Sequence, residues 1–202
     1  MRANALPSTL PPDARAVLDF WFDPPDDPQH GQPRAEWFRK DAAFDAQIRE
    51  RFGALIESAL AGQLSGWAAS AQGALAQLIV LDQFTRNSFR DTARAFAGDA
   101  RALAAARAMV ASGQDRQLGG VQRQFVYLPF EHAEDLAAQQ QSLQLFGQLE
   151  QDEPTLAGLQ DWAHKHQVIV ARFGRFPHRN AALGRPSTAE ELAFLQTPGS
   201  GF

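Results

Sequence analysis

Apolar residues recur along this chain at intervals of three and four, with polar residues between them. The clearest run, at strict four-residue spacing, is Phe44, Ile48, Phe52, Ile56 and Leu60. Such spacing places every member on one face of a helix, which we expect to begin near residue 36 or 41 and to end at residue 60. The apolar–polar alternation that marks half-buried strands is almost absent. The pattern therefore predicts an all-α fold.

Capping residues, glycines and prolines indicate where the other helices begin and end. Asp13 follows two prolines and is expected to cap a first helix, and Ser70 is expected to cap a third. Pro129 is expected to interrupt a helix that starts at residue 121, and Pro177 to end a later one, because proline clashes with the preceding turn. The remaining helices are expected over about residues 92–97, 99–112, 133–149 and 154–176, and after the sequence Ser187-Thr-Ala-Glu190, interpreted as a capping box.

Length and composition fit one domain. The chain has 202 residues, 45% of them hydrophobic and 21% charged, which is an ordinary globular balance. We expect a single helical domain over residues 1–202, with an ordered core at 13–196 and tails at 1–12 and 197–202. The sequence contains no cysteine, so disulfides and thiolate nucleophiles are excluded.

The charge balance bears on possible partners. The formal net charge is −4, without the basic excess that binding to a nucleic-acid backbone normally needs, so we expect no nucleic-acid partner. The first twelve residues lack the apolar core of a signal peptide, and the longest apolar stretch is too short to span a bilayer. We therefore expect a cytoplasmic protein without a membrane partner. The oligomeric state stays open.

Three segments concentrate charged and polar residues beside apolar ones. They are 125–135, where three carboxylates and an imidazole adjoin an aromatic run, 82–87, and the basic segment 172–180. Charged groups are costly to bury unless partners meet them, because each ion loses several kcal/mol of hydration. We therefore expect these distant segments to supply partners to one another in a single charged cluster.

The same segments carry a resemblance to a known family. The motifs are Leu81-Asp-Gln-Phe-Thr-Arg-Asn87, Tyr127-Leu-Pro-Phe-Glu-His-Ala-Glu-Asp135 and Arg172-Phe-Gly-Arg-Phe-Pro-His-Arg-Asn180, with Val17-Leu-Asp-Phe-Trp-Phe22 and Trp37-Phe-Arg-Lys-Asp41. As a set they resemble the bacterial family called domain of unknown function 924. The resemblance implies a tetratricopeptide-like α-helical superhelix of about eight to ten helices, and it brings no established activity.

The sequence departs from the family pattern at three positions. Thr85 stands where proline is expected, Ala133 where serine is common and Ala138 where aspartate is common. A mechanism that needs a hydroxyl at position 133 or a carboxylate at position 138 is therefore in doubt for this chain.

The leading interpretation of the charged cluster is a pocket for a small anionic molecule or a peptide terminus. Arg175 and Arg179, four residues apart, could grip one anion, because guanidinium binds carboxylate or phosphate bidentately. The alternative is a hydrolase or transferase in which Glu131 or His132 acts as general acid or base and Arg175 is the electrostatic stabiliser. The candidate ligand-binding residues of the three segments are Asp82, Gln83, Arg86, Asn87, Glu134, Asp135, Arg172, Arg175, His178, Arg179 and Asn180.

Two further interpretations stay open from the residues alone. The cluster could be a salt-bridge network that only ties helices together in a scaffold. A metal could be held by carboxylates and histidines, but the arginines compete for the same carboxylates, and we expect neither metal nor cofactor. His164 and His166, two apart on a helix, should point to different faces, and we expect them on a solvated surface.

Overall fold

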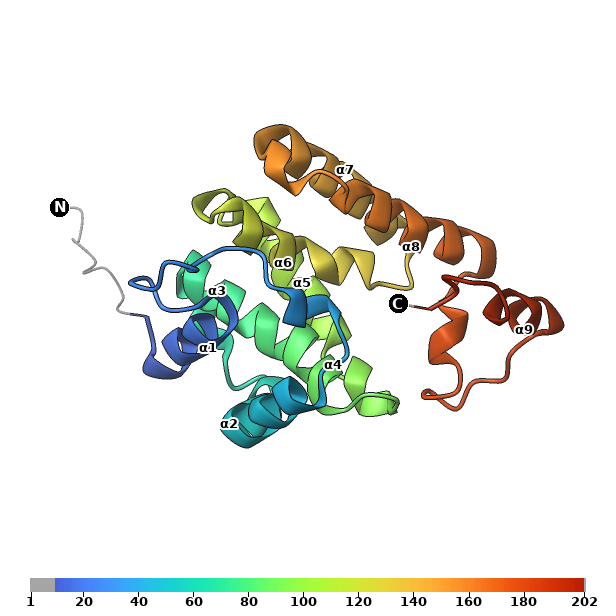
Figure 1. The fold of residues 1–202 in the computed structure, drawn as a ribbon, viewed down its shortest axis with the longest axis horizontal. Coiled ribbons are helices and arrows are strands. Elements are labelled where there is room, and N and C mark those ends of the chain that lie inside the picture. The colour runs from blue at the N-terminus through green and yellow to red at the C-terminus, as the bar shows by residue number, and fades with distance from the viewer. Residues whose placement is uncertain (1–9, 202) are drawn as a thin grey trace.

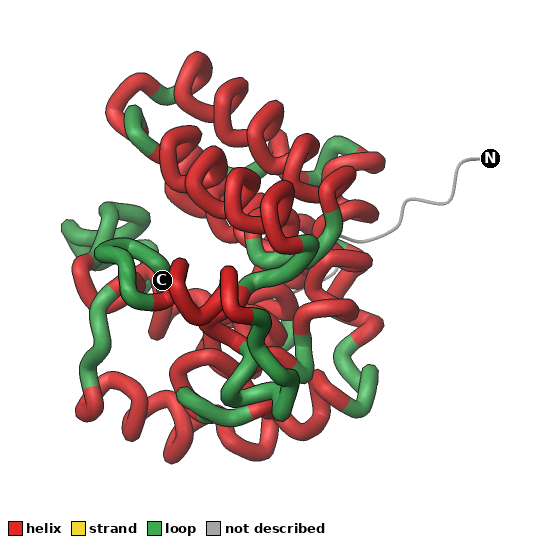
Figure 2. Tube along the Cα trace, turned by 90° about the vertical axis from the view of Figure 1, so that its right-hand side faces the viewer, coloured by secondary structure: helices red, strands yellow, loops and turns green. Residues whose placement is uncertain are grey.

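The computed structural model describes residues 10–201, and within this range it is predominantly helical and contains no strand, which confirms the all-α prediction (Figures 1 and 2). The α-helices are α1 Pro12–Phe22, α2 Ala42–Leu60, α3 Ala71–Leu78, α4 Thr85–Ser88, α5 Asp99–Ser112, α6 Gly120–Glu131, α7 Leu136–Asp152, α8 Leu159–Phe173 and α9 Ala189–Leu195. Short 3-10 helices are η1 Ala35–Phe38, η2 Ser65–Ala69, η4 Ala93–Phe96, η5 Asp115–Gln117, η6 Pro154–Leu156 and η7 Pro177–Arg179, and η3 Ile79–Phe84 is a π-helix.

Successive helices pack against one another. α6 contacts α5 and α7, and α7 in turn contacts α8, so that α6, α7 and α8 run side by side across the upper part of Figure 1. α3 lies against α1, α5 and α6. This order of contacts is compatible with a tetratricopeptide-like superhelix, which stays a prediction.

The main core is aromatic where the first helices meet the π-helix. Phe20 stacks on Phe44 with ring centroids 5.2 Å apart, and Trp21 and Phe52 both contact Phe84, at 5.6 and 4.8 Å. A second, smaller apolar cluster joins the end of α8 to the segment after it; its buried members are Ile169, Val170 and Phe176, with Phe173 and Phe194 packed against them. The segment after α8 therefore has its own apolar contacts.

Local capping signals are confirmed at several helix ends. The Ser70 hydroxyl accepts a hydrogen bond from the Gly73 N–H at 3.1 Å, and Asp41 accepts from two N–H groups of α2. Gly113 ends α5 in the left-handed region, with φ of 72°. The expected cap at Asp13 is wrong, because α1 begins at Pro12 and Asp13 lies inside its first turn.

Three boundary predictions are wrong. Pro129 lies inside α6 rather than interrupting it, because residues 123–131 are all buried and their packing outweighs the lost hydrogen bond. α8 ends at Phe173, where Gly174 takes φ of 69°, and not at Pro177. The capping box is one residue further along, because Thr188 accepts from the Glu191 N–H at 3.1 Å while the Ser187 hydroxyl accepts from Asn180.

The π-helix η3 was not predicted, and it places the first charged segment. It continues α3 into α4, and all six of its residues are buried. Gly98 packs directly on it, because a Cβ at this position would lie 2.0 Å from the Leu81 carbonyl oxygen. This close approach brings the first residue of α5, Asp99, beside the side chain of Arg86.

The ends of the chain bear on the predicted tails. Residues 1–9 and 202 lie outside the described range, so the N-terminal tail stays a prediction. Near the other end, the buried Ser200 hydroxyl donates to the Leu195 carbonyl at 3.1 Å. No helix within residues 10–201 has the length and apolar character needed to cross a membrane.

Candidate functional site

Asp82 is the centre of the cluster that the structure forms. The residue is 1% exposed, and its side chain accepts hydrogen bonds from Gln83 Nε2 at 2.7 Å and Arg86 at 3.0 Å. Asp82 Oδ1 lies 2.9 Å from His132 Nδ1, which confirms that segments 82–87 and 125–135 meet. Burial by itself would raise the pKa of Asp82, but Arg86 and His132 together hold it below its ordinary value. Asp82 is therefore a buried carboxylate that stays ionised.

His132 sits at the C-terminal end of α6 and reaches Asp82 through one ring nitrogen. Because an ionised carboxylate only accepts hydrogen bonds, Nδ1 carries the proton and Nε2 carries the lone pair. Burial and the charge of Arg86 lower the pKa of His132, against the opposing effect of Asp82. His132 Nε2 has no hydrogen-bond partner among residues 10–201 and is not fully buried, and the side chain is 15% exposed.

Glu131, the residue before His132, makes a separate contact. Its Oε1 lies 3.1 Å from Nδ1 of His166, which also lies 2.9 Å from the Trp162 carbonyl oxygen. Burial, with a smaller contribution from Asp82, raises the pKa of Glu131 to about 8. Burial lowers the pKa of His166 to about 3. At neutral pH both groups are therefore uncharged, and their contact is not an ion pair.

The prediction that His166 lies on a solvated surface is wrong. The residue is 5% exposed, whereas His164 is exposed as expected. A signal was present, because His166 lies in the buried stripe that Ala163, Ile169 and Val170 form along α8.

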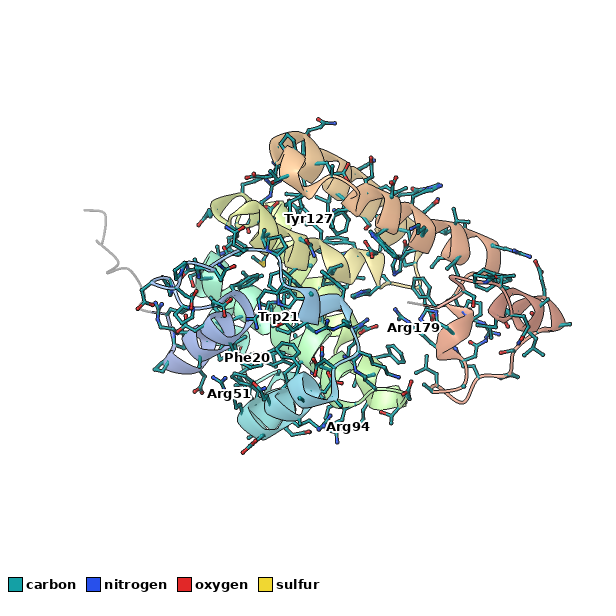
Figure 3. The ribbon with its side chains drawn as sticks, viewed as in Figure 1. Phe20, Trp21, Arg51, Arg94, Tyr127 and Arg179 are labelled. Atoms are coloured by element: carbon teal, nitrogen blue, oxygen red, sulfur yellow. The ribbon has the colours of Figure 1, made fainter. Side chains whose placement is uncertain are left out.

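The basic segment reaches the cluster through Arg179. Arg86 donates to both carboxylate oxygens of Asp99, at 2.9 and 3.1 Å, and Arg179 donates to the same carboxylate at 3.2 Å. The Arg179 guanidinium carbon lies 4.5 Å from the ring centroid of Phe176 and 4.7 Å from that of Phe96. Arg179 is 6% exposed, and its Nε has no hydrogen-bond partner. Figure 3 shows its side chain beside the C-terminal segment.

The electrostatics of Arg179 differ from those of an ordinary ion pair. Burial, helped by the repulsion from Arg86, lowers the pKa of Arg179 to about 10. His178, its neighbour in η7, also has a lowered pKa, about 4, because of burial and the charge of Arg179. At neutral pH Arg179 is therefore a charged group with incomplete compensation, next to an uncharged imidazole. Asp99, which both arginines share, was not among the predicted site residues.

A second network takes up other predicted residues. Arg185 donates to both oxygens of Glu134, at 2.6 and 2.9 Å, and Glu134 also accepts from the Phe176 N–H. Arg175 donates to both oxygens of Glu191, at 2.6 and 2.8 Å. Asn180 completes this network: it donates to Glu191 and to Ser187, and accepts from Arg185.

Arg175 and Arg179 therefore contact different carboxylates and do not face one common anion. Their four-residue spacing would align them only in a continuous helix, and Gly174 ends α8 before both. The sequence analysis missed Arg185 and Glu191. Their partners are brought near only because the chain turns back after α8, and no local sequence pattern predicts that turn.

Three predicted residues lie apart from both networks. Asn87 donates to the buried carboxylate of Asp45 at 2.7 Å. Asp135 caps α7 and pairs with Arg107 at 3.1 Å, with both side chains about half exposed. Arg172 pairs with Glu190 on the surface, the two side chains being 52% and 62% exposed.

Cavities occur elsewhere in the molecule. One of about 490 Å³ lies between α1 and the start of α2 and includes Phe20, Arg34 and Phe44 in its lining. Another, of about 250 Å³, includes Gly120 and Leu156. Neither lining contains a predicted site residue. Within residues 10–201, no group of three or more histidines and carboxylates is placed to hold a metal ion.

Together these features define an all-α protein with a buried carboxylate–imidazole–guanidinium cluster. The chain belongs to the family described as bacterial protein of unknown function (DUF924), whose model matches residues 17–199. It is similar to a solved structure of a protein of unknown function from Agrobacterium tumefaciens, at 41% identity and a TM-score of 0.77. That similarity covers 91% of this chain and 96% of the other. None of the curated proteins compared with the chain matches it.

Proposed function

We propose that the central cluster, defined as Asp82, Arg86, Asp99, His132 and Arg179, binds a small anionic molecule. The observation that carries this proposal is the state of Arg179. This guanidinium is buried, it shares its one carboxylate partner with Arg86, and its Nε lacks a hydrogen-bond partner. A buried donor without a partner costs about 1–3 kcal/mol, and more for a charged group, so an anion that accepts from it gains that amount.

At neutral pH the cluster carries two guanidinium charges and two carboxylate charges, and one of the carboxylates has other hydrogen-bond donors as well. Arg86 and Arg179 face the carboxylates of Asp82 and Asp99, while Glu131 is uncharged at neutral pH. Asp82 is already engaged by His132 and Gln83, so its charge is only partly available to the arginines. A carboxylate or phosphate that binds here would contact the guanidinium groups of Arg86 and Arg179, and it would compete for them with the carboxylates of Asp82 and Asp99.

Access to the cluster is limited but present. The side chains of His132, Arg86 and Asp99 keep 15%, 18% and 23% of their surface exposed. The outer edge of the cluster, formed by these three side chains, is therefore open to solvent.

A thermal-shift titration at low ionic strength tests the proposal, because salt screens charged contacts. Phosphate, sulfate, succinate and citrate are titrated separately against wild type. We expect at least one to raise the melting temperature, and we expect Arg179→Gln to remove that rise. Arg172→Gln is the matched control, since Arg172 is exposed and paired with Glu190. If no anion stabilises wild type, or if Arg179→Gln responds like wild type, the cluster only ties helices together, as in a scaffold.

A peptide terminus presents the same carboxylate chemistry. Short peptides with a free C-terminal carboxylate and their amidated counterparts separate this source from a metabolite. We also propose that the protein is cytoplasmic and has no nucleic-acid or membrane partner. We further propose that its helices form a tetratricopeptide-like superhelix.

A further inference from the structure

We infer that Asp82 and His132 form a general-base dyad that activates water, and that the protein hydrolyses a carboxylic ester whose acyl part carries an anionic group. This hydrolysis rests on the anion site proposed above. Asp82 Oδ1 holds His132 Nδ1 at 2.9 Å, and the other ring nitrogen is left without a protein partner on the partly exposed side of the ring.

The dyad meets the geometric requirements of a general base. A carboxylate that accepts from Nδ1–H fixes the tautomer and the ring orientation, and it stabilises the imidazolium that forms when Nε2 takes a proton. The carboxylate itself is held by Gln83 and Arg86, at 2.7 and 3.0 Å, so its orientation is fixed from two further sides. The π-helix that presents Asp82 and Gln83 is a form of backbone that recurs at functional sites.

The nucleophile that the dyad serves is water. No hydroxyl side chain of residues 10–201 makes a hydrogen bond to His132, and the following residue is Ala133. Glu131 does not serve as the base, because its carboxyl is uncharged at neutral pH and contacts His166. The base in this reaction is therefore His132 rather than Glu131.

The reaction balances within the site. Nε2 takes one proton from water while the water oxygen forms a bond to the carbonyl carbon, and the carbonyl oxygen becomes an oxyanion. When the oxyanion collapses, the bond from carbon to the alcohol oxygen breaks, and the imidazolium returns its proton to that oxygen. The products are the free acid and the alcohol. Arg179 holds the anionic group of the acyl part, and Arg86 adds positive charge beside the oxyanion.

The uncharged state of His132 supports this role, since burial and Arg86 lower its pKa and leave the imidazole unprotonated at neutral pH. The titratable and charged groups around its ring are Asp82, Arg86, His166, His178 and Arg179. Of these, the two histidines also have lowered pKa values and are uncharged at neutral pH, so they leave the base free to accept a proton.

The experiment compares the hydrolysis of p-nitrophenyl hemisuccinate and p-nitrophenyl acetate at neutral pH. We expect wild type to hydrolyse the hemisuccinate at a higher kcat/KM than the acetate. His132→Gln should lose at least about 100-fold in kcat, the usual contribution of a general base. Asp82→Asn should also lose activity and shift the pH profile, because an amide no longer fixes the tautomer. His164→Gln, which changes an exposed histidine of α8, is the control and should keep full activity.

Two further measurements separate the possible failures. Nitrogen-15 NMR of the His132 ring in wild type should show the proton on Nδ1 at neutral pH, and a proton on Nε2 instead would overturn the dyad. Succinate should raise the melting temperature of wild type if the anion site exists. Stabilisation by succinate without hydrolysis of the hemisuccinate overturns the catalysis and leaves the anion site standing. If wild type neither is stabilised by succinate nor hydrolyses the hemisuccinate, the anion site and the catalysis are both overturned. If His132→Gln keeps the hydrolysis, the role of His132 is overturned.

Discussion

Glu131→Gln should make the protein more stable at neutral and alkaline pH. The carboxyl of Glu131 is buried, and its pKa is raised from an ordinary value of 4.5 to about 8. Between these two values the unfolded chain releases the proton while the folded chain keeps it. Stability is therefore undiminished below pH 4.5 and falls as pH rises toward 8. Glutamine has the same shape and no proton to lose, so the variant escapes this loss.

The size of the effect follows from the pKa. Each pH unit inside the interval costs about 1.4 kcal/mol, so wild type should lose about 3 kcal/mol by pH 7 and about 4 kcal/mol by pH 8 relative to acid pH. The carbonyl oxygen of glutamine can still accept from His166 Nδ1, which now lies 3.1 Å from Glu131 Oε1. The substitution should therefore cost little below pH 5.

The assay is urea unfolding of wild type and Glu131→Gln at half-unit steps from pH 5 to pH 8. We expect the free energy of unfolding of the variant, relative to wild type, to rise by about 1.4 kcal/mol per pH unit. Glu190→Gln is the control, because the side chain of Glu190 is 62% exposed. The free energy of unfolding of this variant, relative to wild type, should not change with pH. A difference for Glu131→Gln that is equally flat, or that falls with pH, would refute the assignment of a neutral carboxyl.

Two other substitutions test how the cluster is held in place. Arg185→Gln should lower the free energy of unfolding by about 1–3 kcal/mol at pH 7, because it leaves the partly buried Glu134 without its bidentate partner. The loss should shrink as the pH of urea unfolding falls below 4.5 through the lowered pKa of Glu134, because the carboxylate then protonates and the ion pair is lost in wild type as well. Gly98→Ala should cost about 1–3 kcal/mol by thermal unfolding, since its Cβ would overlap the Leu81 carbonyl oxygen. Gly53→Ala, with open space around it, should instead stabilise by about 0.5–1 kcal/mol.

Local patterns predicted much of the fold because the forces behind them act within one turn of helix. The four-residue apolar run in α2 and the caps at Asp41 and Ser70 depend only on nearby residues. The boundaries at Pro129 and Pro177 were wrong because tertiary packing and a left-handed glycine act there instead. The π-helix had no local signal, since its backbone is stabilised by complete burial rather than by residue type.

The candidate site was predicted in part. Segments that mix charge with apolar residues did point to the meeting of residues 82–87 with residues 125–135, because buried charges need partners. The particular pair of Asp82 and His132 was not predicted. The same reasoning could not choose between Arg175 and Arg179, since their separation depends on how the chain turns after α8. Asp99 escaped it because only the packing of α5 shows what this residue faces. His166 was missed although its place in the apolar stripe of α8 was a usable signal.

The segment after α8 has its apolar contacts on α8 and not in the aromatic core, and ion pairs from Arg185 and Arg179 fasten it to the rest of the molecule. Figure 1 shows it as a separate lobe on the right. Units fastened in this way open at lower free energy than the core to which they attach. Each opening would carry Arg179 away from Asp82 and His132, so the cluster exists only while the lobe is docked. A ligand that contacts both the lobe and the rest of the molecule would stabilise the docked state. Its measured affinity would therefore include the free energy of lobe opening.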